Sequence, residues 1–277
     1  MVETGANIAA FGARRPSLLA RTVWPLINNR RLSQRVRKRL RRSVGEAFAG
    51  PYDISVAGIA FRVYPLDNYC DRTLISRHRF PEPDEHRMLE AWLPQGGVFV
   101  DIGANVGTYT LFAAQKLGPG GRVIAFEPHP VTYAKLRFNI EANGADSVTA
   151  LNCGCGLAAE TMTLWSDGGN NIGSATLVRA ASSNPKVATE IRLDRLPDML
   201  AAHGIARVDA LKIDVEGFED EALLPLFDDA YEHLWPTAVL IEVAHRTVWR
   251  TDIVAHLSER GYRTNDKTGE NLLLVRD

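Results

Sequence analysis

From residue 98 onward the chain alternates between short apolar runs and segments in which apolar residues recur at helical spacing. The runs 98–102, 122–126, 147–152, 210–214, 238–243 and 272–275 are predicted strands, and the segments 108–117, 131–142, 220–227 and 253–260 are predicted helices. The run 98–102 reads Val-Phe-Val-Asp-Ile, a composition expected of a strand buried on both faces. Strands that alternate with helices in this way predict an α/β fold with a mostly parallel sheet.

The helical spacing is absent between residues 156 and 196. Residues 162–165 and 190–193 have the composition of strands and flank a polar loop, 166–173, which together predict a β-hairpin insertion. A loop of this length inside a domain is often functional. Asn170 and Asn171 in this loop are therefore candidates for lining an acceptor pocket, with a plain turn as the alternative interpretation.

The first 97 residues divide into two parts. Residues 53–57 and 60–64 alternate around Gly58, which predicts a hairpin, and the prolines and acids at 81–85 open a helix that ends by 94–97. We therefore expect a basic N-terminal extension at 1–50, an accessory hairpin and lead-in helix at 51–97, and the main domain at 98–277.

Charge is distributed unevenly along the chain. The formal net charge is -1, but residues 30–42 contain eight basic residues and no acidic one. A helix here would place Leu32, Val36 and Leu40 on one side, so one interpretation is a solvated basic helix whose apolar stripe packs on the body. The alternative is a surface that contacts anionic lipid head groups or another anionic partner. Nucleic acid is less favoured, because no aromatic residues interleave with the basic ones.

The sequence favours a cytoplasmic protein, with association at the membrane periphery through residues 30–42 as the alternative. No segment approaches the roughly 18–20 apolar residues of a membrane span, and Arg14, Arg15 and Arg21 interrupt the apolar core that a signal peptide requires. The three cysteines, at 70, 153 and 155, have the count and spacing of reduced thiols and lack the partners of a zinc site.

The turn that follows the first predicted strand of the main domain, Asp101-Ile-Gly-Ala-Asn-Val-Gly107, predicts a ligand site. Glycine allows the backbone to approach a ligand closely, and the helix that begins at Thr108 presents free N–H groups at its start. Dinucleotide folds hold a pyrophosphate in this way. The carboxylate of Asp101 would repel phosphate and instead suits a ligand with ammonium and hydroxyl groups.

Glu127 supports the same interpretation, because it ends the next strand, 26 residues after Asp101, where a carboxylate accepts hydrogen bonds from ribose hydroxyls. With no Gly-x-Gly-x-x-Gly present, the pattern favours S-adenosylmethionine over a nicotinamide cofactor; a tight turn without ligand is the remaining alternative. The predicted cofactor-binding residues are Asp101, Gly103, Asn105, Gly107, Thr108, Glu127, Pro128, Asn152 and Asp214.

Polar residues at the other strand ends are candidates for the acceptor side, since open parallel sheets bind ligands at the carboxyl ends of their strands. We predict Asp214, Glu216 and His245 as catalytic residues that position an acceptor and accept its proton. The alternatives are that Glu216 or Glu219 caps the next helix and that His245 is an ordinary surface residue. Together with Glu242 these groups are also metal-ligand types, but nothing in the sequence fixes a coordination geometry, and we predict no metal.

The sequence resembles the FkbM-type methyltransferases. The matching stretches are 100–107 (Val-Asp-Ile-Gly-Ala-Asn-Val-Gly), 125–128 (Ala-Phe-Glu-Pro) and 211–219 (Leu-Lys-Ile-Asp-Val-Glu-Gly-Phe-Glu), with further likeness at 192–196 and 240–243. The resemblance spans residues 85–275. It implies a Rossmann-like class I methyltransferase fold with a seven-stranded sheet, and O-methylation, often of sugars, polyketides or other secondary metabolites.

Three functions remain in competition on the sequence alone. The favoured one is O-methylation of a hydroxyl on a small molecule or glycan. The second is methylation of nitrogen, or of protein or nucleic acid, which draws support from the basic segment but lacks an Asn/Asp-Pro-Pro-Tyr-like motif. The third is a binding module without activity, which the presence of both predicted cofactor acids, Asp101 and Glu127, disfavours.

Overall fold

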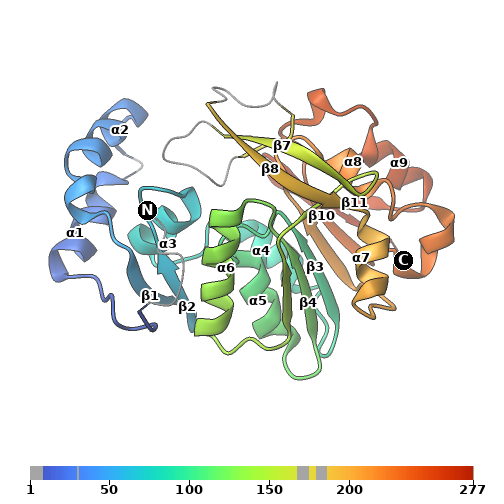
Figure 1. Ribbon diagram of the computed structural model, residues 1–277, viewed down its shortest axis with the longest axis horizontal. Helices are drawn as coiled ribbons and strands as arrows, with labels where there is room; N and C mark the ends of the chain where they lie inside the picture. Colours follow the sequence, from blue (N-terminus) through green and yellow to red (C-terminus); the bar gives the residue numbers. More distant parts are fainter. Residues whose placement is uncertain (1–8, 30, 167–174, 179–185, 277) are drawn as a thin grey trace.

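A seven-stranded sheet forms the centre of the computed structural model, which describes residues 9–29, 31–166, 175–178 and 186–276 (Figure 1). The strand order is β11 (Arg263–Lys267), β12 (Asn271–Val275), β10 (Ala238–Glu242), β9 (Ala210–Ile213), β3 (Val98–Ile102), β4 (Arg122–Phe126) and β5 (Val148–Leu151). Strands β10, β9, β3, β4 and β5 pair in parallel, whereas β12 runs antiparallel to both β10 and β11. The predicted α/β fold with a mostly parallel seven-stranded sheet is confirmed.

Helices cover both faces of this sheet, which explains the unbroken apolar composition of the central strands. In β3, Val98, Val100 and Ile102 pack on one side, while Phe99 packs on the other, because successive side chains of a strand point to opposite faces. The first side is covered by α7 (Leu196–Ala202), α8 (Glu219–Leu223) and α9 (Ile253–Glu259), and the second by α4 (Pro83–Glu90) and α5 (Thr108–Leu117). The remaining helical segments after β4 are α6 (Pro130–Ala142), η3 (Asp229–Leu234) and η4 (Arg246–Val248).

The predicted hairpin insertion is present as a three-stranded sheet of its own. It consists of β6 (Gly154–Cys155), β7 (Glu160–Ser166) and β8 (Val187–Asp194), with β7 antiparallel to β8. Thr176 pairs with Trp165 of β7 across an isolated bridge. We call β7, β8 and residues 175–178 the arm. Asn170 and Asn171, the predicted pocket residues of this insertion, lie outside the described residues.

The N-terminal region packs against the main domain. It contains α1 (Leu18–Ile27), α2 (Gln34–Ser43), η1 (Gly45–Phe48), β1 (Tyr52–Val56), β2 (Ile59–Val63) and α3 (Tyr69–Arg77). The predicted hairpin is β1–β2, and its turn places Ala57 and Gly58 at φ values of 51° and 82°, the left-handed conformation that two-residue hairpin turns require. Buried residues of α1 and the hairpin share one apolar cluster with Leu111 of α5 and Leu136 of α6.

Several sequence-based details were wrong. Helices α1, α3 and α7 were missed, and so was β11, whose five residues are all exposed. The sheet therefore ends at β11, and the last predicted strand, now β12, lies one place inside that edge.

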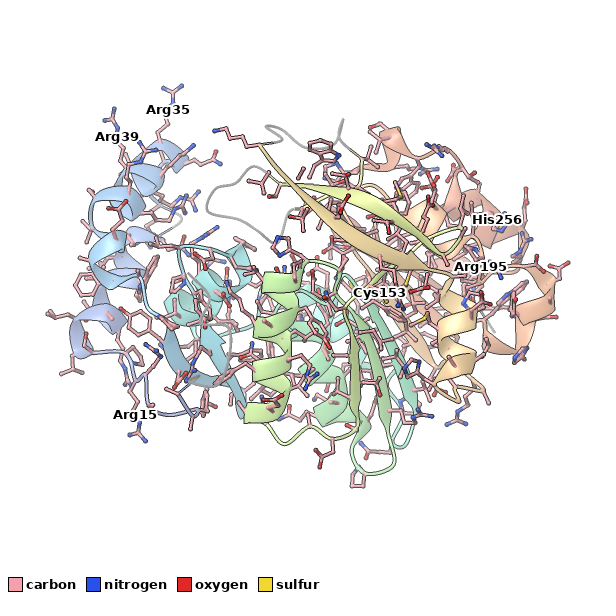
Figure 2. The ribbon with its side chains drawn as sticks, viewed as in Figure 1. Arg15, Arg35, Arg39, Cys153, Arg195 and His256 are labelled. Carbon is pink, nitrogen blue, oxygen red and sulfur yellow. The ribbon has the colours of Figure 1, made fainter. Side chains whose placement is uncertain are left out.

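The helix predicted within residues 30–42 is α2, but its apolar stripe packs only in part. No residue of α2 is buried, Val36 is 42% exposed, and Leu40 contacts the N-terminal cluster as a partly buried side chain. Arg35 and Arg39 point away from the body (Figure 2). In the part of the chain that the structure describes, no helix has the length and apolar character needed to cross a membrane.

Candidate functional site

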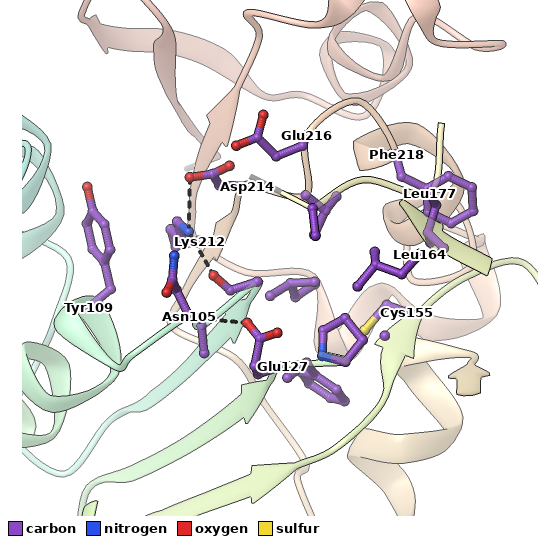
Figure 3. A pocket seen from close by; sticks show the side chains of 18 of the residues that line it. Asn105, Tyr109, Glu127, Cys155, Leu164, Leu177, Lys212, Asp214, Glu216 and Phe218 are labelled. Atoms are coloured by element: carbon purple, nitrogen blue, oxygen red, sulfur yellow. Dashed lines mark hydrogen bonds and ion pairs between the residues drawn. The ribbon is translucent and has the colours of Figure 1, made fainter. Parts of the chain in front are cut away.

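A pocket opens at the carboxyl ends of β3, β4 and β9, on the side where the arm lies (Figure 3). It holds about 870 Å³ of open space, solvent at its mouth included. Its walls come from the turn after β3, the start of α5, the ends of β4 and β9, and the arm with β6. Cys70 of α3 and Glu82, which precedes α4, complete the lining. This is the position at which parallel α/β sheets bind their ligands.

Gly103 shapes the turn after β3. Its φ of 78° lies in the left-handed region, and a Cβ built on it would stand 2.1 Å from the backbone oxygen of Asp214. Only glycine fits at this crossing of the β3 and β9 ends. The backbone N–H groups of Gly103 and Ala104 both donate to the carbonyl oxygen of Phe126, at 3.0 and 2.9 Å, which ties the turn to the end of β4.

Glu127 projects into the pocket from the end of β4. One carboxylate oxygen accepts the N–H of Asn105 and the other that of His129, both at 2.9 Å, and the residue is only 7% exposed. Burial raises the pKa of Glu127 to about 7, because leaving water disfavours the charged form. Each carboxylate oxygen retains a further lone pair for a ligand hydroxyl.

One end of the pocket is apolar. The side chains of Phe126, Pro128, Leu164, Leu177 and Phe218 line it, together with Gly154 and Cys155. Leu164 and Leu177 belong to the arm, so the arm forms one wall of this apolar end (Figure 3).

The other end of the pocket is charged. The ammonium of Lys212 lies 3.5 Å from Asp214 and 3.4 Å from the Gly103 carbonyl oxygen. Burial alone would lower the pKa of Lys212, but the carboxylates of Asp214, Asp101 and Glu82 raise it by more, so the net shift is upward. Glu82 accepts a hydrogen bond from the Tyr109 hydroxyl at 3.0 Å. The lining thus contains four carboxylates, at residues 82, 127, 214 and 216, against one ammonium group.

Glu216 stands at the mouth of this charged end. Its Oε2 lies 3.1 Å from Nε2 of His245, and burial and the neighbouring carboxylates of Asp214 and Glu219 raise its pKa. Its backbone has a φ of 56°, and its carbonyl oxygen accepts the Thr176 hydroxyl of the arm at 2.6 Å.

Glu219 holds the loop that carries Glu216. Its Oε1 accepts the N–H groups of Val215 and Gly217, at 3.0 and 3.1 Å, and its Oε2 accepts the Trp249 indole N–H at 2.7 Å. Neither carboxylate caps α8, which has Phe218 at its N-cap and no side-chain cap hydrogen bond: Glu219 holds the preceding loop, and the Glu216 carboxylate is directed to His245.

Glu242 completes a group of possible metal ligands. Donor atoms of Glu216, Glu242 and His245 all lie within 4.8 Å of one another, and Oε2 of Glu242 is buried without a hydrogen-bond partner among the described residues. Two carboxylates and an imidazole suit a divalent transition metal or a shared proton.

Comparison with known proteins identifies the family. The model of the Methyltransferase FkbM domain matches residues 101–264, more than half of the chain. The chain belongs to the FkbM methyltransferase family. Methyltransferase sdnD of Sordaria araneosa is 32% identical over 198 residues, which cover 61% of this chain and 75% of that protein.

Two further proteins are similar to this chain over part of their length. The 31-O-demethyl-FK506 methyltransferase FkbM of Streptomyces tacrolimicus is 31% identical over 161 residues, covering 49% of this chain and 62% of that protein. The crystal structure of a methyltransferase FkbM from Methylobacillus flagellatus KT is similar with a TM-score of 0.42 and 18% identity, over 76% of this chain and 55% of that one.

Seven of the residues predicted from the sequence line the pocket of this FkbM methyltransferase. They are Gly103, Asn105, Thr108, Glu127, Pro128, Asp214 and Glu216. Asp214 and Glu216 are two residues apart at the end of β9, and both reach the same cavity as expected. Their roles in binding and catalysis remain predictions.

Four predicted residues are placed outside the lining. Asp101 is fully buried and accepts the Thr110 hydroxyl at 2.5 Å, because strand alternation turns its side chain under α5. Gly107 caps α5 with a φ of 92°. Asn152 donates to the backbone oxygens of Glu127 and Pro128, and so supports the segment that carries Glu127. His245 reaches the pocket only through Glu216.

Lys212, Glu82, Tyr109 and Cys70 line the pocket but were not predicted from the sequence. Lys212 could have been predicted from the sequence, because it is a charged residue within the apolar strand β9. Cys70 belongs to α3 and Glu82 precedes α4, and only tertiary packing brings these to the sheet edge.

Proposed function

We propose that this FkbM methyltransferase transfers a methyl group from S-adenosylmethionine to a hydroxyl of a small molecule, sugar or secondary metabolite. The observation that carries the proposal is a single pocket in which Glu127 and the glycine turn face the Asp214–Glu216 wall. Donor and acceptor sites that share one cavity meet the main requirement of methyl transfer, which is alignment of the two reactants.

From one end of the cavity to the other, the lining residues match the successive parts of S-adenosylmethionine. The apolar end suits a flat adenine ring, the Glu127 carboxylate in the middle suits the two ribose hydroxyls, and the charged end suits an amino acid bearing a sulfonium. With four carboxyl groups around the single Lys212 ammonium, the lining offers no excess of positive charge to hold the pyrophosphate of a dinucleotide. When bound, this cofactor supplies an electrophilic methyl group on sulfur.

The chain's own residues would prepare the acceptor. Asp214 and Glu216 face the cavity and can accept hydrogen bonds from an acceptor hydroxyl. Glu216 is the proposed base, because its raised pKa makes it a stronger proton acceptor than an ordinary carboxylate. His245, whose Nε2 lies 3.1 Å from Oε2 of Glu216, holds the carboxylate in place through a hydrogen bond. In this proposal the reaction needs no metal ion.

A hydroxyl acceptor has support from a relative. The name of the Streptomyces tacrolimicus protein describes methylation of a 31-O-demethyl compound, hence of an oxygen. The described pocket lining contains carboxylates that can remove a proton from a hydroxyl. A neutral amine is already nucleophilic and does not require such a base.

The test is transfer of labelled methyl from S-adenosylmethionine to metabolite extracts, followed by mass spectrometry of the labelled product. We expect a low-molecular-mass product with its label on oxygen. Glu216→Gln should reduce labelling at least tenfold, whereas Glu141→Gln, an exposed acid on α6, should not change it. A label on nitrogen or on a macromolecule would refute the proposed acceptor, and lack of cofactor binding would refute the methyltransferase reaction altogether.

A further inference from the structure

The helices α1 and α2 lie together at the end of the molecule away from β10–β12 (Figure 1). One face of α1 is buried through Ala20, Trp24 and Ile27. The other face presents Leu18, Leu19 and Leu26, which are 82%, 68% and 59% exposed. Of the eight exposed large apolar side chains in the described part of the chain, five lie between residues 11 and 36, so the exposure is concentrated here.

Beside this apolar face, α2 presents a dense positive charge. Its ten residues include six basic side chains and no acidic one: Arg35, Arg37, Lys38, Arg39, Arg41 and Arg42. Within the described residues, no ion pair joins these six side chains to a carboxylate. Burial lowers the pKa of Arg41, and the positive charge of the nearby Arg37 lowers it further.

The whole molecule is polarised by this segment. Residues 30–42 contribute +8 to a formal net charge of -1, which leaves -9 on the rest of the chain. Near an anionic surface such a molecule orients with its basic end toward that surface. Arg35 and Arg39, which point outward in Figure 2, would meet that surface first.

Independently of the proposed reaction, we infer that α1 and α2 form a docking surface for an anionic lipid bilayer. Lipid phosphates and carboxylates neutralise the arginines of α2, and the boundary between head groups and acyl chains accepts the leucines of α1. Nucleic acid would satisfy the charges but would leave the leucines in water. The combination of both features on adjacent helices therefore favours the bilayer.

The test is sedimentation of the full chain with phosphatidylcholine vesicles, with and without phosphatidylserine. We expect binding to the anionic vesicles alone. Arg35→Gln combined with Arg39→Gln should weaken it roughly 30-fold, since each basic residue near an anionic surface is worth about fivefold in affinity. The matched control, Arg192→Gln with Arg250→Gln, removes two exposed charges elsewhere and should retain binding.

A second variant tests the apolar half. Leu18→Ser with Leu19→Ser should abolish the binding that persists at raised salt, because salt screens charge but not burial. An unchanged thermal unfolding transition, followed by circular dichroism, shows that each variant is folded. Failure of the wild-type chain to sediment, equal binding to neutral vesicles, or an unaffected Arg35/Arg39 variant would overturn the inference. Preferential binding of RNA in the same buffer would assign the surface to nucleic acid and also overturn it.

Discussion

At the scale of single residues, the candidate site depends on two positions, Gly103 and Glu127, at which the residue type is tightly constrained. Gly103 separates the turn after β3 from the backbone of Asp214, with no room for a Cβ. Glu127 is a buried carboxylate: burial disfavours its charge, and the hydrogen bonds from two backbone N–H groups offset only part of that effect. Both can be tested by conservative substitutions.

Gly103→Ala should destabilise the protein strongly. Its Cβ would overlap the Asp214 carbonyl oxygen, so β3 and β9 would have to separate. We expect a loss of roughly 3 kcal/mol or more in the free energy of unfolding, measured by urea denaturation. The matched control is Gly144→Ala, where φ is also positive but nothing lies within 4 Å; strain alone should cost about 1–2 kcal/mol. Equal losses in the two variants would mean that the Asp214 contact is unimportant.

Binding of S-adenosylhomocysteine should depend on pH through Glu127. Ribose hydroxyls donate to the ionised carboxylate, so binding lowers its pKa from the free value of about 7 and releases a proton. Affinity should then be highest above pH 7 and fall, by about tenfold per pH unit, as pH decreases below it. Calorimetry at several pH values measures both the affinity and the proton release.

The control for this prediction is Glu127→Gln, which keeps an acceptor oxygen but cannot ionise. Its affinity at pH 8 should be roughly 10–100-fold lower, because a charge-assisted hydrogen bond contributes about 1.5–3 kcal/mol. Its pH dependence should be flat. A slope that persists in this variant would point to another group, such as His129, whose pKa is lowered by burial.

How far the site could be read from the sequence also depends on single residues. Asp214 and Glu216 were predictable because they follow directly on a strand whose end must lie at the sheet edge. Asp101, predicted to bind the cofactor, lies outside the pocket lining, because the alternation of β3 puts its side chain on the same face as Phe99, away from Val100 and Ile102. The contact between Glu216 and His245 joins residues 29 apart and depends on how β10 packs beside β9.

At the scale of elements, the strongly patterned strands and helices were predictable and the others were not. The α5 and β4 bounds match the prediction because apolar periodicity and glycine-containing breaks define them. The edge strand β11 reads Arg-Thr-Asn-Asp-Lys and contains no apolar residue, so only its pairing with β12 makes it a strand. Likewise α3 buries polar residues such as Asp71 and Arg72, which hides its amphipathic character.

The possible metal ligands come together through the packing of β10 beside β9, because Glu216 follows β9 while Glu242 ends β10 and His245 lies three residues after it. We expect methyl transfer to survive extensive treatment with a chelator, since the proposed base is Glu216 itself. The measurement is the rate of labelled product formation before and after chelation, with added Mg²⁺, Mn²⁺ or Zn²⁺ in parallel. A loss of rate that one of these ions restores would assign Glu216, Glu242 and His245 to a metal site and refute the metal-free mechanism.

At the scale of the whole molecule, the N-terminal extension shares its core with the main domain. Trp24 of α1 is fully buried and its indole N–H donates to the Phe48 carbonyl oxygen at 3.0 Å. The same apolar cluster includes Phe61 of the hairpin and Leu136 of α6. Segments that appear separate in composition, 1–50, 51–97 and 98–277, are therefore joined through one packed interior.

This shared core predicts one cooperative unfolding transition. Trp24→Ala should lower the free energy of unfolding by about 3–5 kcal/mol and shift the entire transition, as followed by circular dichroism. Leu18→Ala on the exposed face of the same helix should change it by less than about 0.5 kcal/mol. Were the main transition to stay in place in Trp24→Ala, the extension would have to be an independent unit.

The contact of Gly103 with the Asp214 backbone has a consequence for how such enzymes diversify. It fixes the turn after β3, where we propose that the cofactor binds, to the end of β9, where we propose that the acceptor binds, so neither can shift to admit a larger substrate. The arm meets the end of β9 differently, through the hydroxyl of Thr176, which donates to the Glu216 carbonyl oxygen, and β8 joins the arm to β6. New acceptor ranges should therefore arise by exchange or lengthening of the arm, while the distance between the two reacting groups is inherited unchanged.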